Sequence, residues 1–297
     1  MGCRDKKSKN MKINFYNNFH CGDIHNSRIL IKKIMCQLGT DKTYTYSHIN
    51  GNRLLLDVPN LTYINQSLNT NDLVFKHQDE LYINTWVGCA DKNNLRFCSY
   101  GCNALGTMHL LNEIFEKIEI NHKITDEWEM VVDDIDYTKY NIKSIDQFFE
   151  NHTNKIVILC NGDTLSGQSV NFSFDSIINK LCKTYPHVSF ILTSQTNIKH
   201  DNLFYTEDII GNVDGRDLNE IGYLGHRANL IIGRSSGPST FLQTKDTLSD
   251  KNKTFLMFNH TINDAFFSLL GNSKKTHSAD YKESSVLEKI LIEMESI

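Results

Sequence analysis

The residues at 233–240, Gly-Arg-Ser-Ser-Gly-Pro-Ser-Thr, combine hydroxyls, glycines and one guanidinium in a way that suits anion binding. The apolar stretch before them predicts a buried strand, and proline is favoured in the first turn of a helix. Free N–H groups at such a strand-to-helix turn lie at the positive end of the helix, where a phosphate is stabilised. The alternative is an ordinary turn capped by serine, but a cap needs one hydroxyl and this turn has several. We predict a phosphate site with these residues: Arg234, Ser235, Ser236, Gly237, Ser239 and Thr240.

A second polar loop, at 161–169, follows the unbroken apolar run 155–160. Because both apolar runs are predicted to be strands of one sheet, the loop is expected at the same edge. There it would reach the same phosphates through Thr164, Ser166 and Gly167. The loop has neither the G-x-G-x-x-G pattern nor a Walker lysine, so neither a dinucleotide loop nor an ATPase loop is indicated.

The third candidate is the turn at 20–28, which brings a carboxylate, two imidazoles and a guanidinium together. Asp23 is the candidate general base, with the N-cap of the following helix as its structural alternative. His25 is the competing base, because the ordinary pKa of histidine, about 6.5, suits proton transfer near neutrality. We expect His20 and Arg28 to contact the acceptor of the reaction.

These three turns need strands and helices to position them. The hydrophobic pattern of the first half predicts strands at 12–17, 43–49 and 81–86 and helices at 24–38 and 103–118. The second half alternates apolar strands with helices, which is typical of a parallel, doubly wound sheet. Its strands are predicted at 155–160, 188–193, 202–205, 230–233 and 254–258, and its helices at 177–185, 218–227, from 237 onwards and at 284–294.

The chain is therefore predicted to be an α/β protein with two Rossmann-like domains that face each other across a cleft. We expect a flexible leader at 1–10, an acceptor-binding domain at 11–150 and a nucleotide-sugar-binding domain at 151–297. The last helix has an apolar face that must dock, and the N-terminal domain is one candidate surface for it. Ligands of open α/β sheets bind at the carboxyl ends of the strands, so the cleft is the predicted site.

The Gly22-Asp23 turn after the first strand and the 235–240 turn after a late buried strand resemble GT-B glycosyltransferases. The closest similarity is to the ADP-heptose:lipopolysaccharide heptosyltransferase group. In that group a Gly-Asp turn carries the catalytic aspartate, and an Asp-Thr-Gly-Leu-Ser-His segment binds the donor pyrophosphate. This chain matches the segment at Gly237, Ser239 and, conservatively, Ser236, and has serine and threonine where the group has aspartate and histidine.

The resemblance implies transfer of a sugar from a nucleotide-diphosphate sugar to an acceptor hydroxyl on a glycan or other molecule. It places the donor base near the loops after 193 and 205, and inversion of configuration would follow if Asp23 is the base. Those loops contribute Ser194, Gln195, Thr206 and Glu207. We expect no cofactor and no metal, because the positive helix end already faces the leaving group and the acidic residues at 133–136 fall in a predicted linker.

Two other functions fit the same sequence. A nucleotide-sugar epimerase of this fold would use the same phosphate site, and a catalytically silent nucleotide-sugar-binding module would bind without turnover. Hydrolysis, epimerisation or saturation without reaction would distinguish them from transfer.

Composition excludes several other classes of protein. Lys plus Arg number 31 against 35 for Asp plus Glu, so the net charge of −4 does not favour a nucleic-acid partner. Hydrophobic residues make up 40% of the 297, which is enough for a packed core, but they form no run of about 18 that could span a bilayer. We expect a cytoplasmic protein, with peripheral association at a membrane as the alternative.

Overall fold

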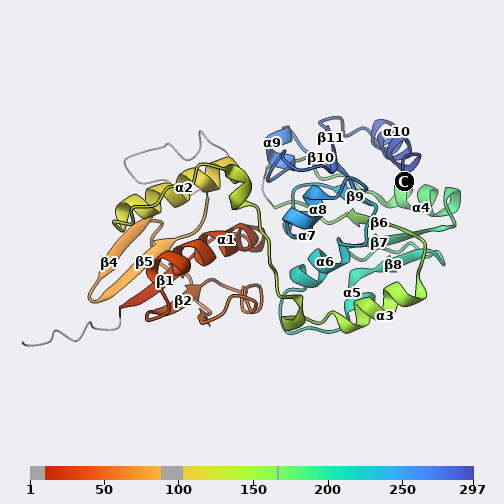
Figure 1. Cartoon of the computed structure of the whole chain (residues 1–297). Helices are drawn as coiled ribbons and strands as arrows, with labels where there is room; N and C mark the ends of the chain where they lie inside the picture. Colours follow the sequence, from red (N-terminus) through yellow and green to blue (C-terminus); the bar gives the residue numbers. More distant parts are fainter. Residues whose placement is uncertain (1–10, 88–102, 166) are drawn as a thin grey trace, which may run out of the picture.

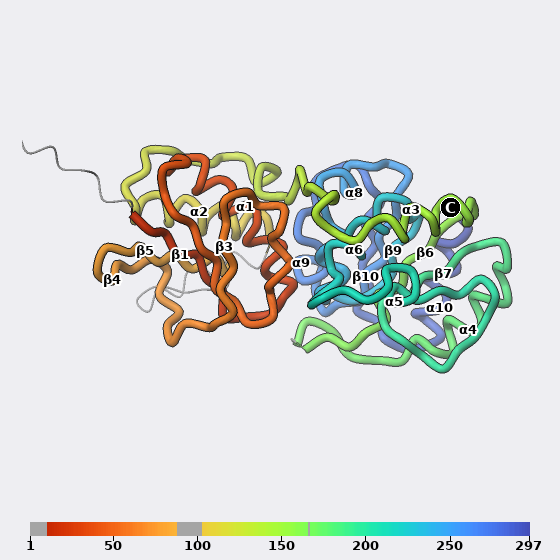
Figure 2. Tube along the Cα trace, turned by 90° about the horizontal axis from the view of Figure 1, so that it is seen from below, coloured from red at the N-terminus to blue at the C-terminus, as the bar shows by residue number. Residues whose placement is uncertain are grey.

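The computed structural model describes residues 11–87, 103–165 and 167–297. The leader expected at 1–10 and the candidate phosphate ligand Ser166 lie outside these residues. The chain forms two α/β domains that lie side by side, and segment 119–142 crosses between them (Figure 1, Figure 2).

The N-terminal domain is built on a sheet with strand order β3-β2-β1-β5-β4. Strands β1, β2, β3 and β5 are parallel, whereas β4 forms an antiparallel edge with β5. Apolar side chains of β1 and α1 are buried together because α1 repeats its apolar residues with helical spacing. The elements are β1 (Lys12–Tyr16), α1 (Cys21–Leu38), β2 (Thr43–Ser47), β3 (Leu61–Ile64), β4 (Val74–His77), β5 (Glu80–Asn84) and α2 (Ala104–Lys117).

The C-terminal domain has a six-stranded, fully parallel sheet with strand order β8-β7-β6-β9-β10-β11. In chain order this is 3-2-1-4-5-6, the order of the doubly wound Rossmann fold. Its strands are β6 (Lys155–Cys160), β7 (Val188–Leu192), β8 (Leu203–Tyr205), β9 (Leu230–Gly233), β10 (Thr254–Phe258) and β11 (Lys274–Ser278). Its helices are α3 (Lys143–Asn151), α4 (Asp175–Thr184), α5 (Thr206–Ile210), α6 (Leu218–Leu224), α7 (Gly237–Phe241), α8 (Lys245–Ser249), α9 (Ile262–Ala265) and α10 (Glu283–Met294).

The central pair of this sheet, β6 and β9, packs closely where both strands end. Cys160 is paired with Gly233, and a Cβ added to Gly233 would lie only 2.6 Å from Cβ of Cys160. A larger residue at 233 would therefore push the strands apart. The glycine fixes the point at which the two loops of the predicted phosphate site leave the sheet.

The connection between the domains follows α2 and contains two 3-10 helices, η2 (Glu127–Met130) and η3 (Tyr137–Lys139). Helix η2 packs on α1 and α2, and further along the connection the N–H of Lys245 donates to the carbonyl oxygen of Val132. The connection is thus anchored to both domains. Helix α3 contacts α5 and so packs on the C-terminal domain. It begins at Lys143, before the position 151 at which that domain is predicted to start.

The last helix, α10, packs on β9 and β10 of its own domain (Figure 1). Its residues Val286, Ile290 and Met294 are buried in the core that also holds β6 and β7. The last helix therefore docks on its own domain and not on the N-terminal domain, which was the candidate surface. Within the described residues, no helix combines the length and the apolar character that crossing a bilayer requires.

Candidate active site

A cavity of about 830 Å³ lies between the two domains. Its walls include the loops that follow β1 and β5 in the N-terminal sheet and β6 and β9 in the C-terminal sheet. In both sheets these two strands are central neighbours, and in the C-terminal sheet the chain winds outward from β6 on one side and from β9 on the other. Such a switch point is where open α/β sheets bind ligands. The volume lies in the usual range for small-molecule sites, roughly 300–1,000 Å³.

The predicted phosphate turn forms part of the C-terminal wall, through Ser235, Ser236, Gly237 and Thr240. Its hydroxyls hold the turn itself. Ser239 Oγ accepts a hydrogen bond of 2.8 Å from the N–H of Ser236 and donates one of 2.7 Å to the carbonyl oxygen of Arg234. Thr240 Oγ1 donates to the carbonyl oxygen of Ser236.

Ser239 is buried and does not line the cavity. The predicted role of Ser239 as a phosphate ligand is therefore wrong, and the hydroxyl of Thr240 also bonds to a backbone carbonyl. The groups left to face the cavity include the N–H of Gly237, which in the first turn of α7 has no acceptor within the helix.

Arg234 does not line the cavity either. Its side chain is fully buried and donates to the carbonyl oxygens of Asn161, Gly162 and Phe172, at 3.0, 2.9 and 3.0 Å. The guanidinium also lies over the rings of Phe172 and Phe174. Arg234 therefore stabilises the loop after β6 through hydrogen bonds to its backbone. This corrects its predicted role as a phosphate ligand.

The guanidinium that does line the cavity is Arg216, in the loop before α6. It is exposed, and it lies near the thiol of Cys21 at the start of α1 in the other domain, where its charge opposes the burial that raises the pKa of that thiol. Among the described residues of the cavity wall it is the one arginine or lysine. The sequence analysis missed it, because a single arginine in an irregular loop belongs to no motif.

His20 and Asp23, two predicted site residues from the turn at 20–28, line the N-terminal wall of the cavity. Helix α1 begins at Cys21 with His20 as its N-cap, so Asp23 is the third residue of the helix and not its cap. Burial raises the pKa of the Asp23 carboxyl to about 6, while the charge of His20 acts in the opposite direction. Asp23 is thus a carboxylate close to the protonation range that general bases need.

Gly22 brings this wall against the phosphate turn. A Cβ added to Gly22 would lie 3.5 Å from Cα of Gly237 and 3.6 Å from Oγ1 of Thr240. Helices α1 and α7 therefore meet almost backbone to backbone at their first turns. Asp23, the next residue of α1, lines the same cavity as the turn predicted to bind phosphate.

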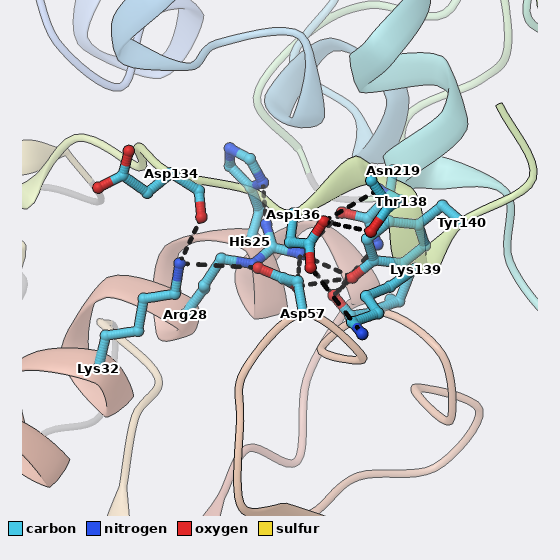
Figure 3. A network of polar contacts seen from close by, with 11 residues as sticks. His25, Arg28, Lys32, Asp57, Asp134, Asp136, Thr138, Lys139, Tyr140 and Asn219 are labelled. Carbon is cyan, nitrogen blue, oxygen red and sulfur yellow. Dashed lines mark hydrogen bonds and ion pairs between the residues drawn. The ribbon is translucent and has the colours of Figure 1, made fainter.

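His25 and Arg28 are buried behind the cavity and do not line it. Nε2 of His25 donates to the carbonyl oxygen of Gln243 at 3.4 Å, and Nδ1 accepts from Arg28 at 3.2 Å (Figure 3). Burial, reinforced by the Arg28 charge, holds the pKa of His25 well below its usual range. The structure thus separates His25 from any substrate in the cavity and corrects its predicted role as an alternative base.

Arg28 is the centre of a buried polar network at the domain interface (Figure 3). Its Nε donates to Asp57 at 3.2 Å, and its Nη2 donates to the carbonyl oxygen of Leu54 at 2.6 Å and to Asn219 at 2.7 Å. The expected contact of Arg28 with an acceptor is therefore wrong, because its guanidinium is already surrounded by protein acceptors.

The remaining predicted donor residues divide into two groups. Thr164 and Ser194 line the cavity, and Asn161 ties their loops together by exchanging two 2.9 Å hydrogen bonds with the backbone of Ser194. Gly167, Gln195, Thr206 and Glu207 do not line it. Gln195 and Glu207 bond to each other instead, at 3.3 Å.

No group of three or more His, Cys, Asp or Glu side chains suited to a metal occurs among the residues the structure describes. The acidic stretch in the linker has other partners. Asp133 pairs with Lys245 at 2.8 Å, and Asp136 accepts from the N–H of Thr138. The stretch lies in the connection between the domains, where the sequence predicts a linker.

No protein-family model and no curated protein sequence matches the chain. Solved structures do. A family 9 glycosyltransferase from Veillonella parvula superposes with a TM-score of 0.53 over 97% of this chain and 92% of that one, at 11% identity. The heptosyltransferase WaaC of E. coli, with ADP-2-deoxy-2-fluoro heptose, gives a TM-score of 0.54 over 96% of this chain and 100% of that one, at 8% identity.

The chain has the GT-B fold. Both superpositions extend over the two domains, so the expected fold class is confirmed. At identities this low the likeness is one of fold. In this GT-B chain the cavity between the domains joins the carboxyl ends of both sheets, and its residues must carry any argument about function.

Proposed function

We propose that this chain is a glycosyltransferase that moves a sugar from a nucleotide-diphosphate sugar to an acceptor hydroxyl. The observation that carries the proposal is the close approach of α1 and α7 at Gly22 and Gly237, with the Asp23 carboxylate and the 235–240 turn lining one cavity. A base for the acceptor and groups for an anionic leaving group thus share one cavity. The fold supports the same assignment, since the glycosyltransferases named above share it.

In the proposed reaction Asp23 accepts the proton of the acceptor hydroxyl while that oxygen forms a bond to the anomeric carbon. The bond between the anomeric carbon and the diphosphate oxygen breaks, and the nucleoside diphosphate leaves with the electron pair. Attack from the face opposite the leaving group inverts the anomeric centre. General-base assistance of this kind contributes about 10²- to 10⁴-fold.

The negative charge that develops on the diphosphate would be met by the N–H of Gly237, the hydroxyl of Ser236 and the guanidinium of Arg216. Thr164 and Ser194 would contact the nucleotide beyond it. With a guanidinium and helix-terminal N–H groups in this position, we propose that transfer needs no divalent metal. Addition of a chelator should then leave the rate of transfer unchanged.

The first experiment is a thermal-shift panel of nucleoside diphosphates and nucleotide sugars, followed by turnover of any donor that binds. A ligand at about 100 times its Kd adds about 2.7 kcal/mol to the free energy of unfolding, which a melting curve detects easily. We expect one nucleoside diphosphate and its sugar conjugates to raise the Tm, and the conjugate to be consumed only with an acceptor. Epimerisation of the donor, or binding without any turnover, would contradict the proposal.

A further inference from the structure

Two features of the N-terminal wall have no role in the reaction as described so far. The first is Asn26, one helical turn after Asp23 in α1. Asn26 is only 7% exposed, yet it lines the cavity, and its side-chain oxygen has no hydrogen-bond partner among the described residues. Burying an acceptor without a donor is unfavourable, so a polar partner from a ligand in the cavity would satisfy this oxygen.

The second feature is an aromatic pair, Phe19 and Trp86, which also lines the cavity. Phe19 follows β1 and Trp86 follows β5, so both stand where the two central strands of the N-terminal sheet end. The rings are stacked, with centroids 3.4 Å apart and planes inclined by 21°. The stacked rings support each other and present an apolar surface to the cavity, on the same wall as Asp23 and Asn26.

A flat apolar surface next to a carboxylate and an amide matches the chemistry of a sugar ring. One face of a pyranose carries C–H groups that pack on an aromatic ring, while its edge carries hydroxyls. Side chains at i and i+3 of a helix have Cβ atoms about 5–6 Å apart, so Asp23 and Asn26 can reach two neighbouring hydroxyls.

We propose that the acceptor is a carbohydrate with two vicinal hydroxyls, whose ring packs on Phe19 and Trp86. One hydroxyl donates a hydrogen bond to Asn26 Oδ1, and its neighbour is the nucleophile whose proton passes to Asp23. This inference rests on the proposed glycosyl transfer, because it identifies the acceptor of that reaction. A nucleobase could also stack on the pair. However, the pair belongs to the N-terminal wall, together with Asp23, whereas the donor nucleotide is proposed to lie on the C-terminal wall.

The chain has two tryptophans, which makes a direct binding test practical. Trp128 lies in η2 and does not line the cavity, so Trp128→Phe leaves Trp86 as the single emitter. This variant is titrated without donor, using methyl glycosides, oligosaccharides and their monodeoxy analogues as probes. Trp86→Phe, which keeps Trp128, is the matched control.

We expect at least one glycoside with vicinal hydroxyls to change the emission of Trp86 saturably and to leave that of Trp128 unchanged. Asn26→Ala should weaken this binding roughly threefold to tenfold, the effect of one neutral hydrogen bond. In the parent protein, the monodeoxy analogue that lacks the hydroxyl bound by Asn26 should bind more weakly than the complete glycoside, by the same factor. In the Asn26→Ala variant the two compounds should bind equally well. The variant should fold, because it removes a buried polar atom that has no partner.

The proposal is overturned if no glycoside changes the emission of Trp86, or if Asn26→Ala binds as tightly as the parent. A response of Trp86 to a nucleoside diphosphate alone would also overturn it, by assigning the pair to the donor base. Because binding is read without donor, failure of sugar transfer itself would not be mistaken for failure of this inference.

Discussion

Nη2 of Arg28 in α1 donates a hydrogen bond of 2.7 Å to Oδ1 of Asn219 in α6, and this bond joins the two domains behind the cavity (Figure 3). The same guanidinium pairs with Asp57, and both side chains are fully buried. A second contact between the domains, from Arg53 to Glu220, lies beside it. The relative position of Asp23 and the phosphate turn therefore depends on buried polar groups at the interface.

Replacing Arg28 with methionine should destabilise the protein strongly. The substitution leaves the buried Asp57 carboxylate with the Tyr140 hydroxyl, at 2.6 Å, and with Lys32, at 3.7 Å, as its one cationic partner among the described residues. Loss of one partner of a buried ion pair costs about 3–5 kcal/mol. Lys32→Met, on the same helix but partly exposed, should cost less than about 1 kcal/mol. Urea unfolding measures both, and an Arg28→Met variant as stable as Lys32→Met would show that the network contributes little.

His25 should make the fold sensitive to acid. Its pKa lies well below the ordinary value of 6.5, so its contribution to stability is present above that pH and is lost as the pH falls below it. His25→Gln removes this contribution. The difference in Tm between the parent protein and His25→Gln should therefore shrink from pH 8 to pH 5. A difference that stays constant would mean that His25 does not titrate with unfolding.

Gly237 provides a matched pair of variants at the phosphate turn. A Cβ added there would meet its nearest neighbour, Leu218, at 3.5 Å, which is ordinary contact, so Gly237→Ala should fold and retain nucleoside diphosphate. Gly237→Asp adds a negative charge where the diphosphate is proposed to lie, and binding should fall below detection. Calorimetric titration compares the two. Equal affinities in both variants would remove this turn from the donor site.

The raised pKa of Asp23 predicts that the carboxylate destabilises the folded protein. Because the folded pKa of about 6 exceeds the ordinary 3.8, the stability of the acid form is lost as the pH rises through 6. Asp23→Asn should therefore raise the free energy of unfolding at pH 8, by about 1–3 kcal/mol. The gain should be smaller at pH 5. Melting curves at the two pH values measure the difference, and a variant less stable at pH 8 would contradict the expectation.

The buried strands and long helices could be predicted from the sequence because their patterns are local. After Lys155 every residue of β6 is apolar, and the structure places this strand at the centre of a parallel sheet. β3, β4 and β11 could not be predicted in this way. β11 reads Lys-Lys-Thr-His-Ser and is a strand because it pairs with β10, which no local pattern reveals.

The same difference applies to the site. Asp23 and Gly237 could be predicted because each follows a predicted strand. Residues that follow the strands of a parallel sheet lie at the cleft, whatever the packing of the helices. Arg234 precedes Gly237 by three residues, but its guanidinium donates to the backbone of the loop after β6 and does not line the cavity. Arg216 reaches the cavity because the domains bring it to Cys21, and that contact follows from packing between domains.

The most direct test of the central claim is the rate of sugar transfer by Asp23→Asn compared with the parent protein. The amide keeps the shape of the side chain but cannot accept the proton, so transfer should fall about 10²- to 10⁴-fold while donor affinity is unchanged. In the parent, kcat/KM should rise with pH through about 6, the value to which burial raises the pKa of Asp23. Asp163→Asn, the same change of charge at the same cavity, should alter transfer much less. Transfer by Asp23→Asn at the parent rate would contradict the account.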